Sequence, residues 1–243
     1  MEPKTPAESE VRQGSAVQSL WGVLLAPEKT FQALAARPVW LPALLLLVAS
    51  ALALSILITP RLDMKQVIRE AIEESGQEVP AAQIDLQVEM ADKFKWVGTA
   101  SQVILQPGAL LLMAGVFLVL LRLAGSEIDF RRSLAVSVHG LLPQALATVL
   151  AIPVVLSRSE LSMQDLRSAT FLRSNLAAFA PESTGKAMLS LLSSVDLFSL
   201  WTIALLAIGF RVVGRVSKAA AWGVVLTLWV LMVGGKLALA AIF

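Results

Sequence analysis

Long runs of apolar residues, nearly free of charge, recur along the chain and are separated by polar connections. Five of them are long enough to cross the hydrocarbon core of a bilayer, which needs about 20 mainly apolar residues. They cover residues 39–59, 99–121, 134–156, 187–210 and 219–243. Backbone groups in lipid must find their hydrogen-bond partners within the membrane, and these runs lack the polar alternation of barrel strands. The pattern therefore predicts an all-α, polytopic membrane fold with five transmembrane helices.

The segment before the first run has two parts. Residues 1–14 form a polar tail that we expect to be disordered, and residues 15–243 are expected to form a single membrane domain. From Ser15, apolar residues recur at helical spacing, and Pro27 suits the first turn of a second short helix. Both helices are too short to span a bilayer, so we expect them at the membrane interface. An anchor and lid for the bundle is the first interpretation, and a docking surface for a partner is the alternative.

Two longer connections are expected on the opposite side of the membrane, and both are predicted to be helical. Residues 60–98 suggest a hairpin of two helices, 62–75 and 81–97, with a break at 76–80. Residues 157–186 suggest one or two amphipathic helices lying on the end of the bundle. The acidic residues of the first connection fit a solvated helix face, because no calcium-binding loop pattern is present.

Composition agrees with a membrane protein and excludes several functions. The chain is 56% hydrophobic and 16% charged, whereas soluble domains are about 45–50% apolar and about 25% charged. The net charge is only +2, so the chain has no large excess of basic residues with which to bind nucleic acid. We therefore do not expect nucleic acid as a partner. Cysteine is absent, which excludes disulfides, zinc–thiolate sites and thiol nucleophiles.

Basic residues in the short connections predict the orientation. The connections 122–133 and 211–218 carry Arg122, Arg131, Arg132, Arg211, Arg215 and Lys218. We therefore expect an inner-membrane protein with a cytoplasmic N-terminus and with Phe243 at the far, periplasmic face. The first span is expected to serve as an uncleaved targeting element.

Signatures of catalysis are missing. The chain contains no phosphate-binding loop, dinucleotide fingerprint, zinc-protease helix or nucleophile elbow. One histidine and no cysteine leave almost nothing to ligate a transition metal. We expect no catalytic residue, no metal site and no cofactor.

Two lone charges within the apolar runs are the candidate site. Asp196 lies 15 residues before Arg211, and Lys236 lies 16 residues after Ala220. On helices joined by a short hairpin these positions fall at nearly equal depth. We expect Asp196 and Lys236 to approach each other, with Gln106 completing a polar cluster. A buried ion pair that fixes helix register, a proton- or substrate-linked site, and a Lys236 that snorkels to the interface remain open.

Two further features concern the third run. His139 is expected to make a satisfied hydrogen bond between helices, in preference to a role in proton relay. Pro143 and Pro153 are expected to kink this span.

Short motifs resemble those of a known family. The segment Trp21-Gly-Val-Leu-Leu-Ala-Pro27-Glu-Lys-Thr30-Phe31 precedes the first run, and Asp196-Leu-Phe198-Ser-Leu-Trp201 lies in the fourth. In their order and spacing these segments resemble the bacterial branch of the Yip1 family, from about Ser15 to the C-terminus. The resemblance implies five spans with a cytoplasmic N-terminus, and it marks Pro27, Phe31, Phe198 and Trp201 as candidate packing positions of the family motifs.

The eukaryotic relatives interact with Rab GTPases and carry a D-L-Y-G-P motif. This chain has no tyrosine, so we expect no Rab-type GTPase as a partner. For the bacterial branch the resemblance implies mostly architecture. Because signatures of catalysis are missing, we expect a non-enzymatic integral membrane protein, a scaffold or accessory subunit in membrane organisation or transport. Its expected partners are the lipid bilayer and a membrane protein or a second copy of the chain. The alternative is a small transporter or channel subunit whose polar site is formed by Asp196, Lys236 and Gln106.

Overall fold

The computed structural model describes residues 17–76, 79–159, 161, 172, 174–181 and 184–242. The predicted polar tail 1–14, and most of the predicted amphipathic helices within 157–186, lie outside these ranges. Apart from two isolated bridges, the regular structure in the described ranges is helical. Five helical segments are long and apolar enough to cross a membrane: Leu41–Arg61, Ala81–Leu123, Phe130–Leu156, Leu197–Gly214 and Lys218–Ala238. The expected all-α polytopic fold is therefore confirmed.

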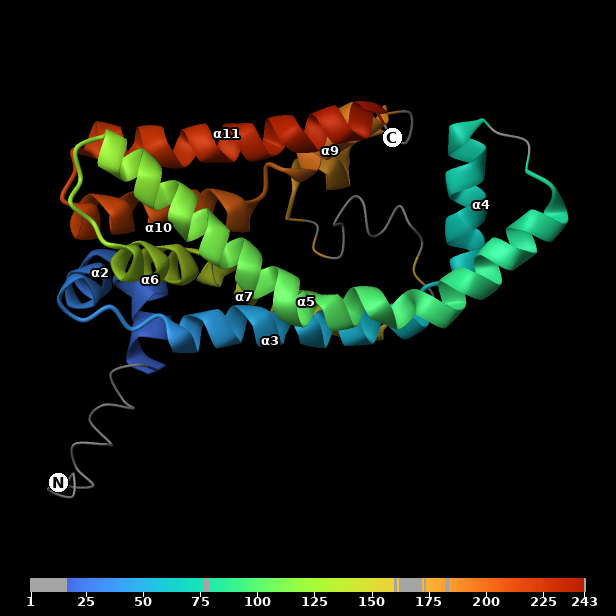
Figure 1. The fold of residues 1–243 in the computed structure, drawn as a ribbon, viewed down its shortest axis with the longest axis horizontal. Helices are drawn as coiled ribbons and strands as arrows, with labels where there is room; N and C mark the ends of the chain where they lie inside the picture. The colour runs from blue at the N-terminus through green and yellow to red at the C-terminus, as the bar shows by residue number, and fades with distance from the viewer. Residues whose placement is uncertain are drawn as a thin grey trace, which may run out of the picture. The chain divides into compact units, whose positions relative to one another are not determined.

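Figure 1 shows the helices in chain order from blue to red. After helical residues 17–25 come α2 (Pro27–Ala36), α3 (Leu41–Ile58), the 3-10 turn η1 (Thr59–Arg61), α4 (Met64–Ser75), α5 (Ala81–Leu123), α6 (Phe130–Gly140), α7 (Leu142–Leu156), the 3-10 turn η2 (Leu176–Phe179), α9 (Lys186–Ser193), α10 (Leu197–Gly214) and α11 (Lys218–Ile242).

The chain forms two compact units. The first takes in Met1–Val48, Gln106–Ala145 and Leu200–Trp229, and the second takes in Ala49–Leu105, Leu146–Ser199 and Val230–Phe243. Five of the described helices contribute residues to both units: α3, α5, α7, α10 and α11.

The first unit contains the main hydrophobic core. Within it, α2 packs against α6 (Figure 1). The rings of Phe117 and Phe210 lie 4.6 Å apart between centroids. Gly209 allows a close approach: a Cβ atom there would lie 2.6 Å from Val136 and 2.9 Å from the ring of Phe31. The absence of a side chain at Gly209 thus lets α2, α6 and α10 meet.

The second unit is held by hydroxyl groups and by capped helix ends. Thr59 and Ser55 both hydrogen-bond the hydroxyl of Thr99, at 2.7 and 2.9 Å, and these bonds connect the end of α3 to α5. Asp63 caps α4 by accepting from the N–H groups of Lys65 and Gln66. Gly76, with φ of 65°, ends α4 in the left-handed conformation that favours glycine. The predicted helix over 62–75 and the break after it are confirmed.

The second span differs from its prediction by being part of a longer helix. The structure joins the predicted helix 81–97 and the run 99–121 into the single 43-residue helix α5, which continues through Pro107. Gly98 alone does not break a helix, since a glycine costs only about 1 kcal/mol relative to alanine in a helix interior.

The fourth predicted span, 187–210, is divided. Helix α9 ends at Ser193 and α10 begins at Leu197. Between them a turn at Ser194 leads to a short antiparallel bridge of Asp196 with Asn175. In it, Leu176 N–H donates to the carbonyl of Val195, and Leu197 N–H donates to that of Ser174. Because these groups are paired outside a helix, the spanning helix starts ten residues later than its hydropathy predicts.

Candidate functional site

Asp196 lies at the start of α10 and not in the middle of a spanning helix. Its Oδ1 accepts from the N–H groups of Phe198 and Ser199 at 2.9 and 3.1 Å, and its Oδ2 accepts from the Ser199 hydroxyl. These are the bonds of a helix N-cap, which satisfies backbone donors left unpaired at a helix start. The carboxylate therefore has a structural role at the end of α10.

Lys236 has a different partner. It is exposed, and its Nζ donates to the Ser193 hydroxyl at 3.1 Å. None of the ion pairs within the described part of the chain joins Lys236 to Asp196. Helix α10 is 18 residues long, about 27 Å, which is close to the thickness of the hydrocarbon core. Asp196 directly precedes this segment, so its charge lies at the end of the candidate span and not within it.

Gln106 belongs to the first unit, whereas Asp196 and Lys236 belong to the second. Its Nε2 donates to the carbonyl of Leu47 at 3.2 Å, and its Oε1 is buried without a partner. Asp196 and Lys236 thus make separate contacts, a helix cap and a lysine–serine bond, and Gln106 bonds α5 to α3. That Gln106 completes a polar cluster with them stays a prediction.

A double-mutant cycle distinguishes the cap from an ion pair. We expect Asp196→Ala to lower the free energy of unfolding by about 0.5–2 kcal/mol, while Asp196→Asn has a smaller effect because asparagine also caps helices. Lys236→Met should change it by less than about 0.5 kcal/mol, and the double variant should be additive. The measurement is unfolding in mixed micelles by denaturing detergent. Non-additive effects, with Asn as damaging as Ala, would contradict the cap.

His139 makes the predicted bond between helices. Its side chain is fully buried, Nδ1 lies 2.9 Å from the carbonyl of Ala135, and Nε2 lies 3.1 Å from the hydroxyl of Ser19. Nδ1 donates to the carbonyl, and in a neutral ring Nε2 accepts from the hydroxyl. The expected satisfied hydrogen bond is confirmed, and it attaches helical residues 17–25 to α6.

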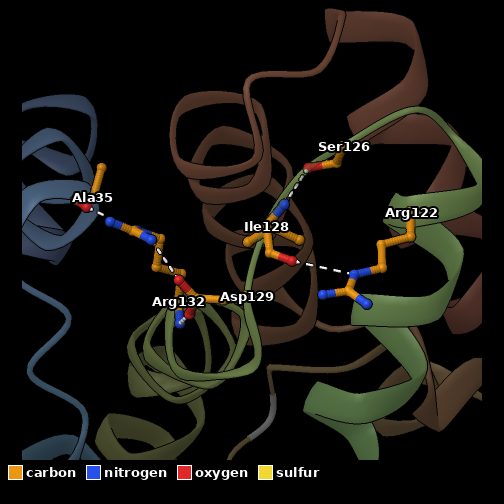
Figure 2. A network of polar contacts seen from close by, with 6 residues as sticks. All are labelled: Ala35, Arg122, Ser126, Ile128, Asp129 and Arg132. Atoms are coloured by element: carbon orange, nitrogen blue, oxygen red, sulfur yellow. Dashed lines mark hydrogen bonds and ion pairs between the residues drawn. The ribbon is translucent and has the colours of Figure 1, made fainter.

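A network of polar contacts lies at the connection between α5 and α6 (Figure 2). Gly125, with φ of 87°, follows the end of α5. Ser126 is buried; its hydroxyl donates to the carbonyl of Gly214 at 2.6 Å and accepts from the N–H of Ile128 at 3.2 Å. Arg122 Nε donates to the carbonyl of Ile128 at 3.4 Å. The loop is thereby attached to the end of α10.

Arg132 extends this network to α2. Its Nε donates to the carbonyl of Ala35 at 2.9 Å, and its guanidinium also pairs with Asp129 (Figure 2). The Ala35 carbonyl lies in the last turn of α2, where carbonyls lack helical partners and a cation is favourable. Asp129 in turn caps α6 by accepting from the N–H of Arg132. Arg132 therefore binds both a carbonyl in the last turn of α2 and the carboxylate that caps α6.

The ionisation of Asp129 follows from these contacts. Burial raises the pKa of Asp129, but hydrogen bonds from the backbone and side chain of Arg132, and its charge, outweigh burial and hold the pKa below the ordinary 3.8. A carboxyl whose pKa is lowered by folding adds stability above its ordinary pKa and loses it as pH falls through the lower value.

A pH series checks this linkage. We expect wild type to have a higher melting temperature than Asp129→Asn at pH 7, and the difference should shrink as pH falls below 3.8. Asparagine keeps the capping acceptor, so the difference reports the charge. Melting in detergent micelles measures it; a difference independent of pH would show that the Arg132 contact contributes nothing.

Beside this network lies an open hollow. Its volume is about 450 Å³, and it is lined by Pro38, Asp129, Phe130, Arg131 and Arg132. Further exposed basic residues of the first unit are Lys29, Arg37, Arg122, Arg215 and Lys218. An ion pair between Arg211 and Glu28 joins α10 to α2. The hollow and these basic residues are named here the basic surface. They belong to the N-terminal segment and to the two short connections, which are predicted to be cytoplasmic.

From the sequence, these arginines predicted only the orientation, and the network was not predicted. One local pattern could have indicated part of it. Asp129 lies three residues before Arg132 at the start of a helix, a spacing that favours both an N-cap and an ion pair. The contact of Ser126 with Gly214 joins residues 88 apart and leaves no local pattern.

The motif residues lie where packing matters. Phe31 is fully buried among α6 and α10, and Phe198 is 8% exposed. Pro27 is the first residue of α2, and Trp201 is half-buried on α10.

The five spanning helices, the capped connections and the buried motif residues define a polytopic helical membrane protein. The Yip1 domain matches residues 21–239, and the chain belongs to the Yip1 family.

A curated bacterial relative covers nearly the same length. The chain is similar to "Membrane protein YknW" of Bacillus subtilis (strain 168), with 27% identity over 216 residues, 88% of this chain and 87% of that protein. No solved structure matches the chain.

Proposed function

We propose that this protein is a non-enzymatic scaffold or accessory subunit of the inner membrane, which binds a membrane-protein partner through the basic surface. The N-terminus and the basic surface would face the cytoplasm, in keeping with the positive-inside rule. The observation that carries the proposal is a set of exposed basic side chains on connections that the polar network holds in place.

The chemistry of that surface favours an acidic partner. Arg131 and Arg132 line the hollow beside Phe130, which is 40% exposed. Arginine and aromatic side chains are enriched at protein interfaces, where guanidinium groups bind carboxylates in a bidentate manner. Because Arg132 and Ser126 fix the surrounding loop, little conformational entropy would be lost on binding.

Charge reversal tests the proposal in the full-length protein. We expect the chain, extracted in a mild detergent at its native level, to migrate on a native gel as a stoichiometric complex. The double variant Arg131→Glu/Arg215→Glu should migrate as the free chain, with its melting temperature unchanged because both residues are exposed.

The matched control reverses two exposed charges on α4, Lys65→Glu and Arg69→Glu, which lie away from the basic surface in sequence and belong to the other unit. This variant should keep the complex. A wild-type chain that migrates as a free monomer, or a complex that survives reversal of the basic surface, would contradict the proposal.

The alternative, a small transporter or channel subunit, depends on Asp196, Lys236 and Gln106 forming a polar site. It makes a different prediction: substrate or ion flux in vesicles that Asp196→Asn abolishes. The capping bonds of Asp196 explain the presence of a carboxylate at this position without a transport role. The scaffold is therefore the proposal that we favour.

A further inference from the structure

Helical residues 17–25 carry an apolar stripe on their outer face. Val17, Trp21 and Leu25 are 56%, 64% and 84% exposed, and their spacing of four places them on one side of the helix. The other side is also apolar: Val23 is fully buried, and Leu20 and Leu24 pack against the core of the first unit. A helix that is apolar on both sides is typical of an element surrounded by nonpolar material.

The depth of this helix is set by its contact with α6. Ser19 lies 3.1 Å from His139, which is nine residues after Phe130, where the third spanning segment begins. Nine residues of helix correspond to about 13 Å. The polar headgroup layer on each side of a bilayer is only about 5–8 Å thick. The helix therefore lies beside the part of α6 that is inside the membrane.

Helix α2 extends to the charged ends of two neighbouring helices. Glu28 pairs with Arg211 of α10, and Ala35 accepts from Arg132 of α6, while Phe31 packs close to Val136. The chain thus runs from residues 17–25 through α2, whose outer contacts are charged, and then enters α3 at Leu41.

We propose that helical residues 17–25 form a lipid-embedded helix, and that Val17, Trp21 and Leu25 contact the phospholipid acyl chains of the leaflet on the N-terminal side. The partner of this stripe is lipid because its neighbour, α6, is membrane-embedded at the same level. The sequence predicts only that this helix lies at the membrane interface. The proposal adds how deep the helix lies and which side of it faces lipid. A second copy of the chain or another protein would cover the stripe in a different way, which the experiment distinguishes.

The absence of cysteine allows a direct measurement. Single variants Val17→Cys and Leu25→Cys, each carrying a nitroxide label, are reconstituted into vesicles of phosphatidylcholine and phosphatidylglycerol. Collision of the label with oxygen, which concentrates in lipid, is compared with collision with a water-soluble nickel chelate. Leu112→Cys, a 71% exposed site within α5, is the lipid reference, and Lys218→Cys is the water reference.

We expect the labels at Val17 and Leu25 to favour oxygen several-fold over nickel, as the label at Leu112 does. Because both side chains are exposed, the variants should keep the wild-type melting temperature. Nickel access equal to that at Lys218 would overturn the proposal by placing the stripe in water. Exclusion of both reagents would assign the stripe to a protein partner, and dipolar broadening that disappears on dilution with unlabelled chain would assign it to a second copy.

Discussion

Replacing Gly209 by alanine is expected to lower the free energy of unfolding by about 1–3 kcal/mol, the usual cost of overpacking a core. The new methyl carbon would lie 2.6 Å from a methyl group of Val136 and 2.9 Å from the ring of Phe31. Both neighbours are fully buried, so neither has room to move. Denaturing-detergent titration of the purified protein in mixed micelles measures the change.

Gly223 provides a matched control, because it is also a helical glycine of the first unit and a Cβ atom there would meet nothing within 4 Å. Gly223→Ala should be neutral or stabilising by up to about 1 kcal/mol, since alanine is the better helix former. In the Gly209→Ala background, Val136→Ala should recover part of the lost stability, because the two substitutions share one contact. Equal effects at Gly209 and Gly223 would contradict the close packing of α2, α6 and α10.

The second large effect is expected at Ser126. Ser126→Ala removes the donor to the Gly214 carbonyl and the acceptor for the Ile128 N–H. Because Ser126 is buried, both backbone groups would remain without partners, at a cost of about 1–3 kcal/mol. Hydrogen exchange should also become faster at the N–H of Ile128, whose hydrogen bond is lost.

Ser157 is the control for this substitution. Its hydroxyl donates to the carbonyl of Val154, but the residue is exposed, so water replaces the lost bond. Ser157→Ala should change stability by less than about 0.5 kcal/mol. If Ser126→Ala has an effect this small, the loop after α5 is not held to α10 by the serine.

The architecture was predictable from the sequence because lipid imposes a simple requirement on length and polarity. A run such as 39–59 admits one structure in a bilayer, and α3 with η1 forms it. The effect of Pro143 was also expected: α6 ends at Gly140 and α7 begins at Leu142, although the helix continues through Pro153. Local chemistry decides such features.

Helix ends were less predictable, because they depend on polar groups that hydropathy ignores. Phe130, Arg131 and Arg132 belong to α6, since Asp129 caps the helix there, although the apolar run begins at Leu134. The same cause affects Asp196. Hydropathy predicts this residue to be a charge inside a span, but its carboxylate caps the start of α10.

The candidate site was hardest to predict, because its contacts join distant parts of the chain. Lys236 and Asp196 are matched in their number of residues from the short hairpin, yet each has its own partner. Equal depth is a necessary condition for an ion pair, but it does not specify which faces of two helices meet. The bonds from Arg132 to Ala35 and from Ser126 to Gly214 depend on tertiary packing in the same way.

The length of α5 has a mechanical consequence. Its 18 residues before Thr99 extend the membrane-spanning part by about 27 Å without a break. Residues 81–105 of this helix belong to the second unit, and no loop interrupts them. A load applied at one end of this segment would therefore reach its other end with nothing between them to absorb it.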